Sequence, residues 1–157
     1  METTLYKSKF GHLKITSMDQ FLVSIDMNPV EPFNNLDSEF NNFVIFQLEE
    51  YFQGERTSFD VPLKLLSSSE FNIKVWNEIL KVPYGKSTSY KAISERIGHK
   101  SAYRAVGTAV GKNPIPFIVP CHRVINANGS LGGFSLGLDI KKELIKIEQM
   151  DGLKKNY

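Results

Sequence analysis

The sequence is poor in cysteine: Cys121 is the single one among 157 residues. One cysteine excludes an internal disulfide and a zinc site built from several thiolates. The histidines, His12, His99 and His122, are far apart and lack metal-ligand spacing. We therefore expect no metal and no other cofactor. Cys121 itself is either an idle buried thiol or the centre of the function.

The sequence also lacks a hydrophobic run of transmembrane length, and no basic-then-apolar leader follows Met1. Hydrophobic residues make up 41% and charged residues 23%, which is typical of a folded, soluble domain. These features weaken membrane and secreted interpretations. We expect a cytoplasmic protein, or a nuclear one if the source is a eukaryote.

Net charge is small, +2, but it is unevenly distributed. Residues 1–69 carry 5 basic and 10 acidic side chains, whereas residues 70–157 carry 14 and 7. Between residues 86 and 123, Glu95 is the only acidic side chain among seven basic ones. A basic region of this kind is typical of phosphate contacts, although an ordinary solvated surface explains the charge alone equally well.

The pattern of apolar residues and turn signals predicts two parts. Three short alternating segments predict a small antiparallel sheet, at 5–10, 13–16 and 21–27. A helix is expected over 39–53, and a linker over 55–69. Beyond the linker the pattern is helical. We predict an α+β fold, in which a domain at 1–68 packs on a mostly helical domain at 69–157.

The helical part contains a predicted helix-turn-helix. Apolar spacing indicates helices from Ser69 to the Pro83 break, and at about 88–97, 101–110 and 139–150. Ser87 or Thr88 is expected to cap the second helix, and Ser101 the third. The second and third helices are short and joined by a turn that contains glycine, which is the helix-turn-helix arrangement.

One face of the third helix is both basic and close to small residues. Four polar residues recur there at four-residue spacing: Lys100, Arg104, Thr108 and Lys112. Small residues such as Ala105 and Gly107 let a helix backbone approach another helix or a nucleic-acid groove. The coincidence of small and basic residues favours DNA over simple helix packing.

Two further residues carry the chemistry expected around Cys121. His122 is adjacent, and a nearby imidazole favours the nucleophilic thiolate, although neighbours in an extended strand point apart. Glu148 lies at the edge of the apolar face of the last helix, where a carboxylate needs a partner. A carboxylate–imidazole–thiol arrangement would supply one. The alternatives are solvent exposure or pairing with Lys141 or Lys142.

The segment Pro120-Cys121-His122-Arg123-Val124 resembles the active-site signature of the O6-alkylguanine-DNA alkyltransferases, also called methylated-DNA–protein-cysteine methyltransferases. Five other stretches follow the family's order and spacing: 47–63, 83–90, 104–107, 111–114 and 142–148. The resemblance covers residues 45–150 closely and the first 40 residues loosely.

This resemblance implies DNA repair by irreversible transfer of the alkyl group from O6-alkylguanine to Cys121, once per molecule. The partner would be double-stranded DNA that contains the lesion, with O4-alkylthymine left open, and the protein would act as a monomer. His122 would be the general base through a bound water, and Glu148 would orient it. Tyr90 would donate to the leaving guanine.

The resemblance also implies binding roles. Asn113 would tie the recognition helix to the active-site loop, and Arg104 would enter the stack from the minor groove as the nucleotide flips out. Contacts to the base or alkyl group are implied for Tyr90, Gly107, Val110, Val124, Phe134 and Ser135. Further DNA contacts are implied for Lys100, Tyr103, Ala105, Thr108, Lys112 and Arg123.

Three residues depart from the family pattern. Phe134 stands where Tyr is frequent, Tyr103 is larger than the Ala common before the arginine, and Val110 narrows the alkyl pocket. An alkyltransferase-like or helix-turn-helix DNA-binding protein without transfer activity is the alternative, but neither accounts for Cys121. A cysteine hydrolase lacks separate support. We also predict that Cys121 titrates below the free-thiol value of about 8.5.

Overall fold

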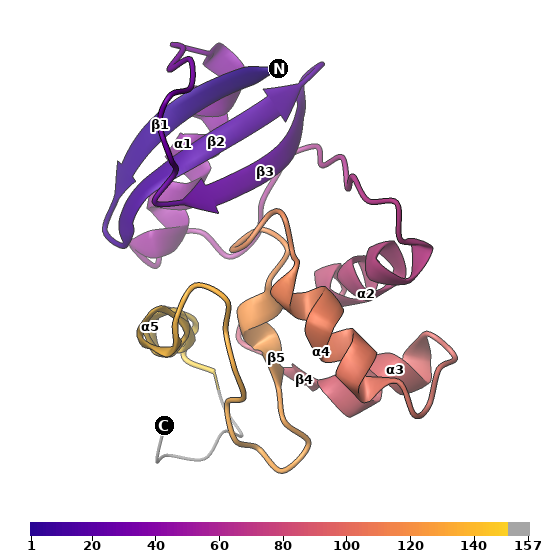
Figure 1. Cartoon of the computed structure of the whole chain (residues 1–157). Coiled ribbons are helices and arrows are strands. Elements are labelled where there is room, and N and C mark those ends of the chain that lie inside the picture. The colour runs from indigo at the N-terminus through magenta and orange to yellow at the C-terminus, as the bar shows by residue number, and fades with distance from the viewer. Residues whose placement is uncertain (151–157) are drawn as a thin grey trace. The chain divides into compact units, whose positions relative to one another are not determined.

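The N-terminal strands form a meander. The computed structural model describes residues 1–150, and its first strands form an antiparallel sheet in chain order (Figure 1): β1 (Glu2–Ser8), β2 (Gly11–Met18) and β3 (Phe21–Met27). The β2–β3 hairpin turns through Asp19 and Gln20, whose φ angles of 52° and 65° suit a two-residue turn that follows the strand twist. The predicted sheet is confirmed, with strands that begin earlier than expected at β1 and β2.

Helix α1 (Glu39–Phe52) covers one face of this sheet (Figure 1). The hydroxyl of Ser38 begins the helix by accepting a hydrogen bond from the backbone N–H of Asn41. Val44, Leu48 and Tyr51 point to the sheet side and are fully buried. The helix predicted over 39–53 is therefore confirmed, and its apolar stripe forms the core of this part of the chain.

The described chain divides into two compact units. The first contains residues 1–66 together with 114–116, and the second contains 67–113 and the chain from 117 onward. Within the first unit, the backbone N–H of Ile25 in β3 donates to the carbonyl oxygen of Pro114, 2.9 Å away. The domain boundary at residue 68 remains a prediction, and it does not include this excursion. Residues 151–157 of the predicted second domain lie outside the described part.

Up to residue 150, the second unit contains four α-helices: α2 (Glu70–Leu80), α3 (Tyr90–Arg96), α4 (Tyr103–Gly111) and α5 (Leu138–Glu148). The indole Nε1 of Trp76 on α2 donates to the carbonyl oxygen of Ala109 on α4, at 2.8 Å. Helices α3 and α4 pack together after a turn through Gly98, whose φ of 82° favours glycine. The predicted helix-turn-helix is confirmed. Its cap at Ser101 is wrong, because Ala102 precedes α4 and makes no side-chain cap.

A short parallel bridge positions the start of α3. β4 (Thr88–Ser89) pairs with β5 (Val124–Ile125), which directly follows the Cys121 segment. Ser89 rather than Ser87 or Thr88 caps α3, because Thr88 is held in the bridge opposite Val124. The bridge thereby places Tyr90, the first residue of α3, beside the chain that carries the cysteine.

The arrangement as a whole is the α+β fold that the sequence predicts. Within residues 1–150, no helix combines the length and the apolar character needed to cross a bilayer. The second unit is the part that positions the candidate site, since every predicted site residue belongs to it.

Candidate active site

Cys121 lies at the start of a single 3-10 turn, Cys121–Arg123, and only 2% of its surface is exposed. The turn follows Pro120 and is closed by the N–H of Arg123, which donates to the carbonyl oxygen of Pro120 at 2.9 Å. Because successive residues of a turn do not alternate as in a strand, the thiol and the next side chain both point inward. The sequence left open whether the side chains of Cys121 and His122 point to opposite faces, and the turn shows that they do not.

Burial dominates the ionisation of Cys121. It raises the pKa of the thiol to about 11, although the Asn113 amide, the Lys141 ammonium and backbone N–H groups act in the opposite direction. The prediction that this thiol titrates below about 8.5 is therefore wrong for the resting protein. That prediction rested on the neighbouring His122 and on nearby helix dipoles, and it did not anticipate that the thiol is buried. A thiol that rests protonated requires a base at the moment of reaction.

Asn113 holds the segment that leads to the cysteine. Its Nδ2 donates to the carbonyl oxygen of Val119 at 2.8 Å, and its side chain also hydrogen-bonds to Cys121. Asn113 follows the C-terminal end of α4, so the contact links the helix-turn-helix to the cysteine turn. This is the linking geometry that the family resemblance implies for Asn113.

His122 and Glu148 form a buried pair. The imidazole Nε2 lies 2.5 Å from Oε2 of Glu148, and both side chains are fully buried. Because an ionised carboxylate only accepts hydrogen bonds, Nε2 carries the hydrogen, and Nδ1 is the basic nitrogen of the neutral ring. Burial lowers the pKa of His122, and this outweighs the opposing effect of Glu148. The resting ring is neutral and can accept a proton.

Glu148 is ionised in this environment. Burial alone raises the pKa of a carboxyl group, but hydrogen bonds and charge from His122 and Arg123 outweigh it and lower the pKa of Glu148 to about 2. The backbone N–H of Gly85 donates to Oε1 as well, at 3.0 Å. The alternatives of solvent exposure or pairing with Lys141 or Lys142 are wrong, because the carboxylate faces the cysteine turn.

Arg123 was predicted to contact DNA, but the structure places its side chain against Glu148 and Val82. The residue is 7% exposed and its guanidinium faces inward. Nε and Nη2 donate to the two oxygens of Glu148, at 2.8 and 3.1 Å, and Nη1 donates to the carbonyl oxygen of Val82 at 2.7 Å. A guanidinium with these partners cannot reach a phosphate, so its predicted DNA contact is wrong.

Lys141 is a buried cation that sequence reasoning missed as a site residue. Its Nζ donates to three carbonyl oxygens, those of Val124, Leu131 and Gly133, at 2.8, 2.6 and 3.1 Å. Burial lowers the pKa of this amine to about 8, with the Cys121 thiol acting in the opposite direction. The available signal was its spacing, since Lys141, Leu144 and Glu148 share one helix face.

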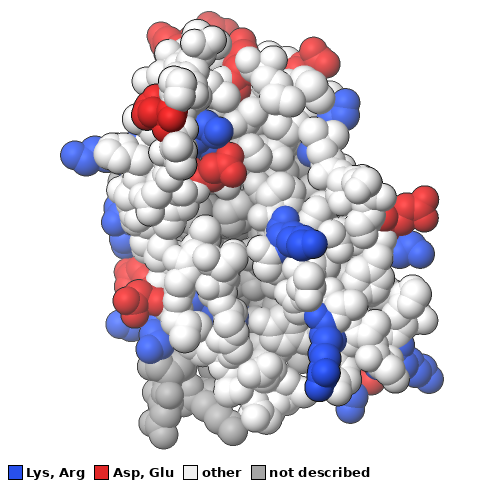
Figure 2. Space-filling view, viewed as in Figure 1, with Lys and Arg blue, Asp and Glu red and all other residues white. Residues whose placement is uncertain are grey.

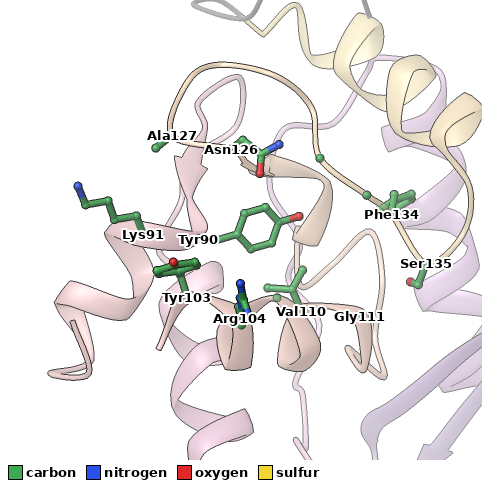
Figure 3. A pocket seen from close by; sticks show the side chains of 13 residues that line it. Tyr90, Lys91, Tyr103, Arg104, Val110, Gly111, Asn126, Ala127, Phe134 and Ser135 are labelled. Carbon is green, nitrogen blue, oxygen red and sulfur yellow. The ribbon is translucent and has the colours of Figure 1, made fainter. Parts of the chain in front are cut away.

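A cavity of about 620 Å³ opens beside these groups. It is lined by the helix-turn-helix on one side and by the loop at 126–135, which contains several glycines, on the other: Tyr90, Lys91, Tyr103, Arg104, Gly107, Val110, Gly111, Asn126, Ala127, Gly132, Gly133, Phe134 and Ser135. In Figure 3 the ring of Tyr90 projects into its centre, with Tyr103 and Arg104 on one side and Asn126 on the other. Six of the lining residues were not predicted as site residues: Lys91, Gly111, Asn126, Ala127, Gly132 and Gly133.

Tyr90 connects this cavity to the thiol. Burial raises the pKa of its phenol, and the nearby Cys121 raises it further, so the hydroxyl stays protonated and can donate. A Cβ placed on Gly132 would lie 3.2 Å from the Tyr90 ring and from its hydroxyl, and Gly132 has a φ of 70°. Glycine at position 132 therefore lets the loop lie directly against the phenol.

The outer face of α4 carries the remaining predicted DNA contacts. Six residues there or just beside the helix are exposed: Lys100, Tyr103, Arg104, Ala105, Thr108 and Lys112. Tyr103 is 51% exposed although it also lines the cavity. In Figure 2 the region over α3 and α4 shows blue side chains with few red ones, which agrees with the charge of this part of the sequence.

The predicted site residues thus fall into two adjoining groups. Cys121, His122, Glu148 and Val124 form a buried cluster with the half-buried Asn113 at its edge, and the carbonyl oxygen of Val124 accepts a hydrogen bond from Lys141. Gly107, Val110, Phe134 and Ser135 line the open cavity. Tyr90 belongs to both, since it lines the cavity and interacts with the thiol.

Family models of known proteins match both halves of the chain. The model of the 6-O-methylguanine DNA methyltransferase DNA binding domain matches residues 70–150, and that of the ribonuclease-like domain of the same family matches residues 1–65. The chain belongs to the 6-O-methylguanine DNA methyltransferase family. The resemblance seen in the sequence is confirmed, and it extends to the N-terminal residues where the motifs were loose.

Individual members of the methyltransferase family align over most of the chain. The methylated-DNA–protein-cysteine methyltransferase of Metallosphaera sedula is 41% identical over 146 residues, 91% of this chain and 90% of that protein. That of Methanosarcina acetivorans is 53% identical over 102 residues, which span 65% of each chain. The crystal structure of Mycobacterium tuberculosis OGT in complex with DNA has a TM-score of 0.87 at 37% identity, and covers 95% of this chain and 93% of that one.

Proposed function

We propose that this protein repairs DNA by transferring the alkyl group of O6-alkylguanine directly and irreversibly to Cys121. The observation that carries the proposal is a buried thiol with a His122–Glu148 pair behind a cavity lined by Tyr90. The activity is that of a methylated-DNA–[protein]-cysteine S-methyltransferase. Family membership supports it, as do relatives named for this reaction at up to 53% identity.

DNA binding is the first step. Double-stranded DNA is the partner, and the exposed face of α4 with Arg104, Ala105 and Thr108 is proposed to enter the minor groove. Arg104 takes the place of the lesion in the base stack, and the nucleotide rotates into the cavity. A base inside a duplex cannot reach a thiol that is 2% exposed, so flipping at a cost of a few kcal/mol is required.

Alkyl transfer follows by in-line displacement. His122 takes the thiol proton at Nδ1, through a water in the family's mechanism, and Glu148 stabilises the imidazolium that forms. The Cys121 sulfur bonds to the alkyl carbon while the bond between that carbon and O6 breaks. The electron pair of the broken bond passes to O6 and the guanine ring. Tyr90 donates to that ring, which then takes up a proton and becomes normal guanine.

The remaining site residues shape the cavity. We assign the backbone at Val124 and Ser135 to holding the base, and Gly107 and Phe134 to its walls. Val110 borders the space where the alkyl group would lie. The thioether product is stable, so each molecule reacts once. A single reactive thiol needs no second subunit, which supports a monomer.

Two broader expectations accompany this activity. The reaction requires access to the chromosome, which supports a cytoplasmic protein in a prokaryote and a nuclear one in a eukaryote. We place the domain boundary between residues 68 and 69. The N-terminal domain would support the fold, and the C-terminal domain would bind DNA and carry out the reaction. O6-alkylguanine is the proposed lesion, with O4-alkylthymine as a substrate to be tested alongside it.

The test is a methyl-transfer assay read by mass spectrometry. Incubation with a duplex that contains O6-methylguanine should add one methyl group to the protein, and peptide analysis should place it on Cys121. The Cys121→Ser variant and an unmodified duplex are the controls, and both should give no adduct. Absence of an adduct in the wild-type protein under reducing conditions would contradict the proposal.

A further inference from the structure

Arg123 occupies a position that the proposed chemistry leaves without a role. All three of its terminal nitrogen groups donate: Nε and Nη2 to Glu148, at 2.8 and 3.1 Å, and Nη1 to the carbonyl oxygen of Val82 at 2.7 Å. A planar guanidinium matches the two oxygens of a carboxylate, and lysine cannot reproduce this contact. Arg123 therefore restricts both the position and the rotation of the Glu148 carboxylate.

The same guanidinium links three segments of the second unit. It comes from the cysteine turn, it contacts the end of α5 through Glu148, and it contacts the turn after α2 through Val82. In that turn the N–H of Gly85 also donates to Glu148, and the Tyr84 hydroxyl donates to the carbonyl oxygen of Ile147 at 3.0 Å. The Arg123 guanidinium lies 5.8 Å from the centre of the Tyr84 ring.

Charge reinforces this geometry. The charged and titratable groups that act on His122 are Glu148, Arg123 and Lys141, with Cys121 next in the chain and Tyr84 beside Glu148 and Arg123. Burial has the largest effect and lowers the pKa of His122, Glu148 has the next largest effect and raises it, and Arg123 and Lys141 lower it. Without Arg123, Glu148 would share its charge with fewer donors and would favour a protonated imidazole more strongly.

We propose that Arg123 is a positioning residue of alkyl transfer, which fixes the Glu148 carboxylate by a two-point contact and thereby orients His122 as the base. The proposal rests on the proposed function of the same site. It assigns Arg123 an action through Glu148 and no contact with DNA. Arg104 and Arg123 thus divide two tasks between two arginines, DNA contact and orientation of the base.

The experiment compares Arg123→Lys, which keeps the charge but not the fork, with Arg123→Gln, which removes the charge. Arg56→Gln is the matched control, because Arg56 also contacts a glutamate, Glu50, through Nε and Nη2 but belongs to the first unit. The readouts are single-turnover methyl transfer, affinity for duplex DNA at several salt concentrations, and titration of the histidine ring signals by NMR.

Both Arg123 variants should transfer methyl about tenfold more slowly or worse, since a general base contributes about 10²–10⁴-fold. Their affinity for DNA and its salt dependence should stay within about twofold of wild type, because no phosphate contact is lost. The His122 titration should move to higher pH in Arg123→Gln and less in Arg123→Lys. Arg56→Gln should change none of these readouts.

Three results would overturn the proposal. One is a lower DNA affinity with a reduced salt slope, which would restore Arg123 to the DNA contacts. Another is an unmoved His122 titration in Arg123→Gln, and the last is an unchanged transfer rate. Absence of transfer in the wild-type protein would contradict the proposed function instead, while the His122 titration would still test the orientation by Arg123.

A measurement on the wild-type chain covers the case in which the variants do not fold. The Nε–H of Arg123 should exchange slowly with solvent, and Glu148→Gln should abolish that protection by removing the charged acceptor. The Nε–H of Arg104, which is exposed, is the reference for fast exchange. Fast exchange at Arg123 in the wild-type protein would overturn the two-point contact itself.

Discussion

The Nζ atom of Lys141 lies 2.6 Å from the carbonyl oxygen of Leu131, and the same amine also holds Gly133. Lys141→Met should therefore release the loop that carries Phe134 and Ser135, because the carbonyl oxygens lose a shared donor. We expect faster amide hydrogen exchange over residues 129–137 and about tenfold slower reaction with O6-benzylguanine. Lys146→Met, exposed on the same helix, is the control, and equal exchange in both variants would contradict this tether.

Arg104→Ala should separate base flipping from chemistry. Its side chain is exposed beside the cavity, so its loss should slow repair of a duplex by about 10- to 100-fold, in line with a flipping cost of a few kcal/mol. Reaction with free O6-benzylguanine, which needs no flipping, should stay within about twofold of wild type. Equal losses on both substrates would remove the flipping role of Arg104.

Alkylation of the resting thiol should be slow at neutral pH. Burial raises the pKa of Cys121 to about 11, so the rate of reaction with iodoacetamide should keep rising with pH beyond the free-thiol value of about 8.5. The chain has one cysteine, so total thiol labelling reports this site alone. The urea-unfolded protein provides the reference curve. A rate that levels off below about 8.5 in the folded protein would show that the thiolate is stabilised before substrate binds.

Acid stability should depend on Glu148. Its pKa is lowered from 4.5 to about 2, so its contribution to the free energy of unfolding is complete above pH 4.5 and is lost as the pH falls toward 2. The shift corresponds to roughly 3 kcal/mol. Glu148→Gln should lose less stability over this interval, as measured by urea unfolding at a series of pH values. Glu95→Gln, exposed on α3, should retain the wild-type dependence.

The elements of this fold follow from local sequence signals to a large extent. Alternation in the first strands, the helix over 39–53, the helical pattern from Ser69 to Pro83 and the turn at Gly98 each correspond to an observed element. Cap residues were less predictable, because Thr88 is diverted into a bridge with Val124. Such a bridge joins residues far apart in sequence and leaves no local signal.

The residues of the site were predicted better than their ionisation states and charge interactions. Cys121, His122 and Glu148 stand out as residue types at suggestive positions, and the structure buries all three. The roles of Arg123 and Lys141 could not be predicted from the sequence, because the residue type alone does not show whether a basic side chain is buried or exposed to solvent. Their partners are mostly backbone oxygens or a carboxylate that only the tertiary fold brings near.

The short excursion of residues 114–116 has a consequence for how such proteins can be divided. The chain leaves the second unit after Asn113, pairs Pro114 with β3, and returns at Phe117, four residues before the cysteine. Truncation or recombination at the linker would separate residues 114–116 from β3, with which Pro114 forms a hydrogen bond. Because the backbone passes between the two units three times, we expect residues 67–157 expressed alone to be less stable than the whole chain.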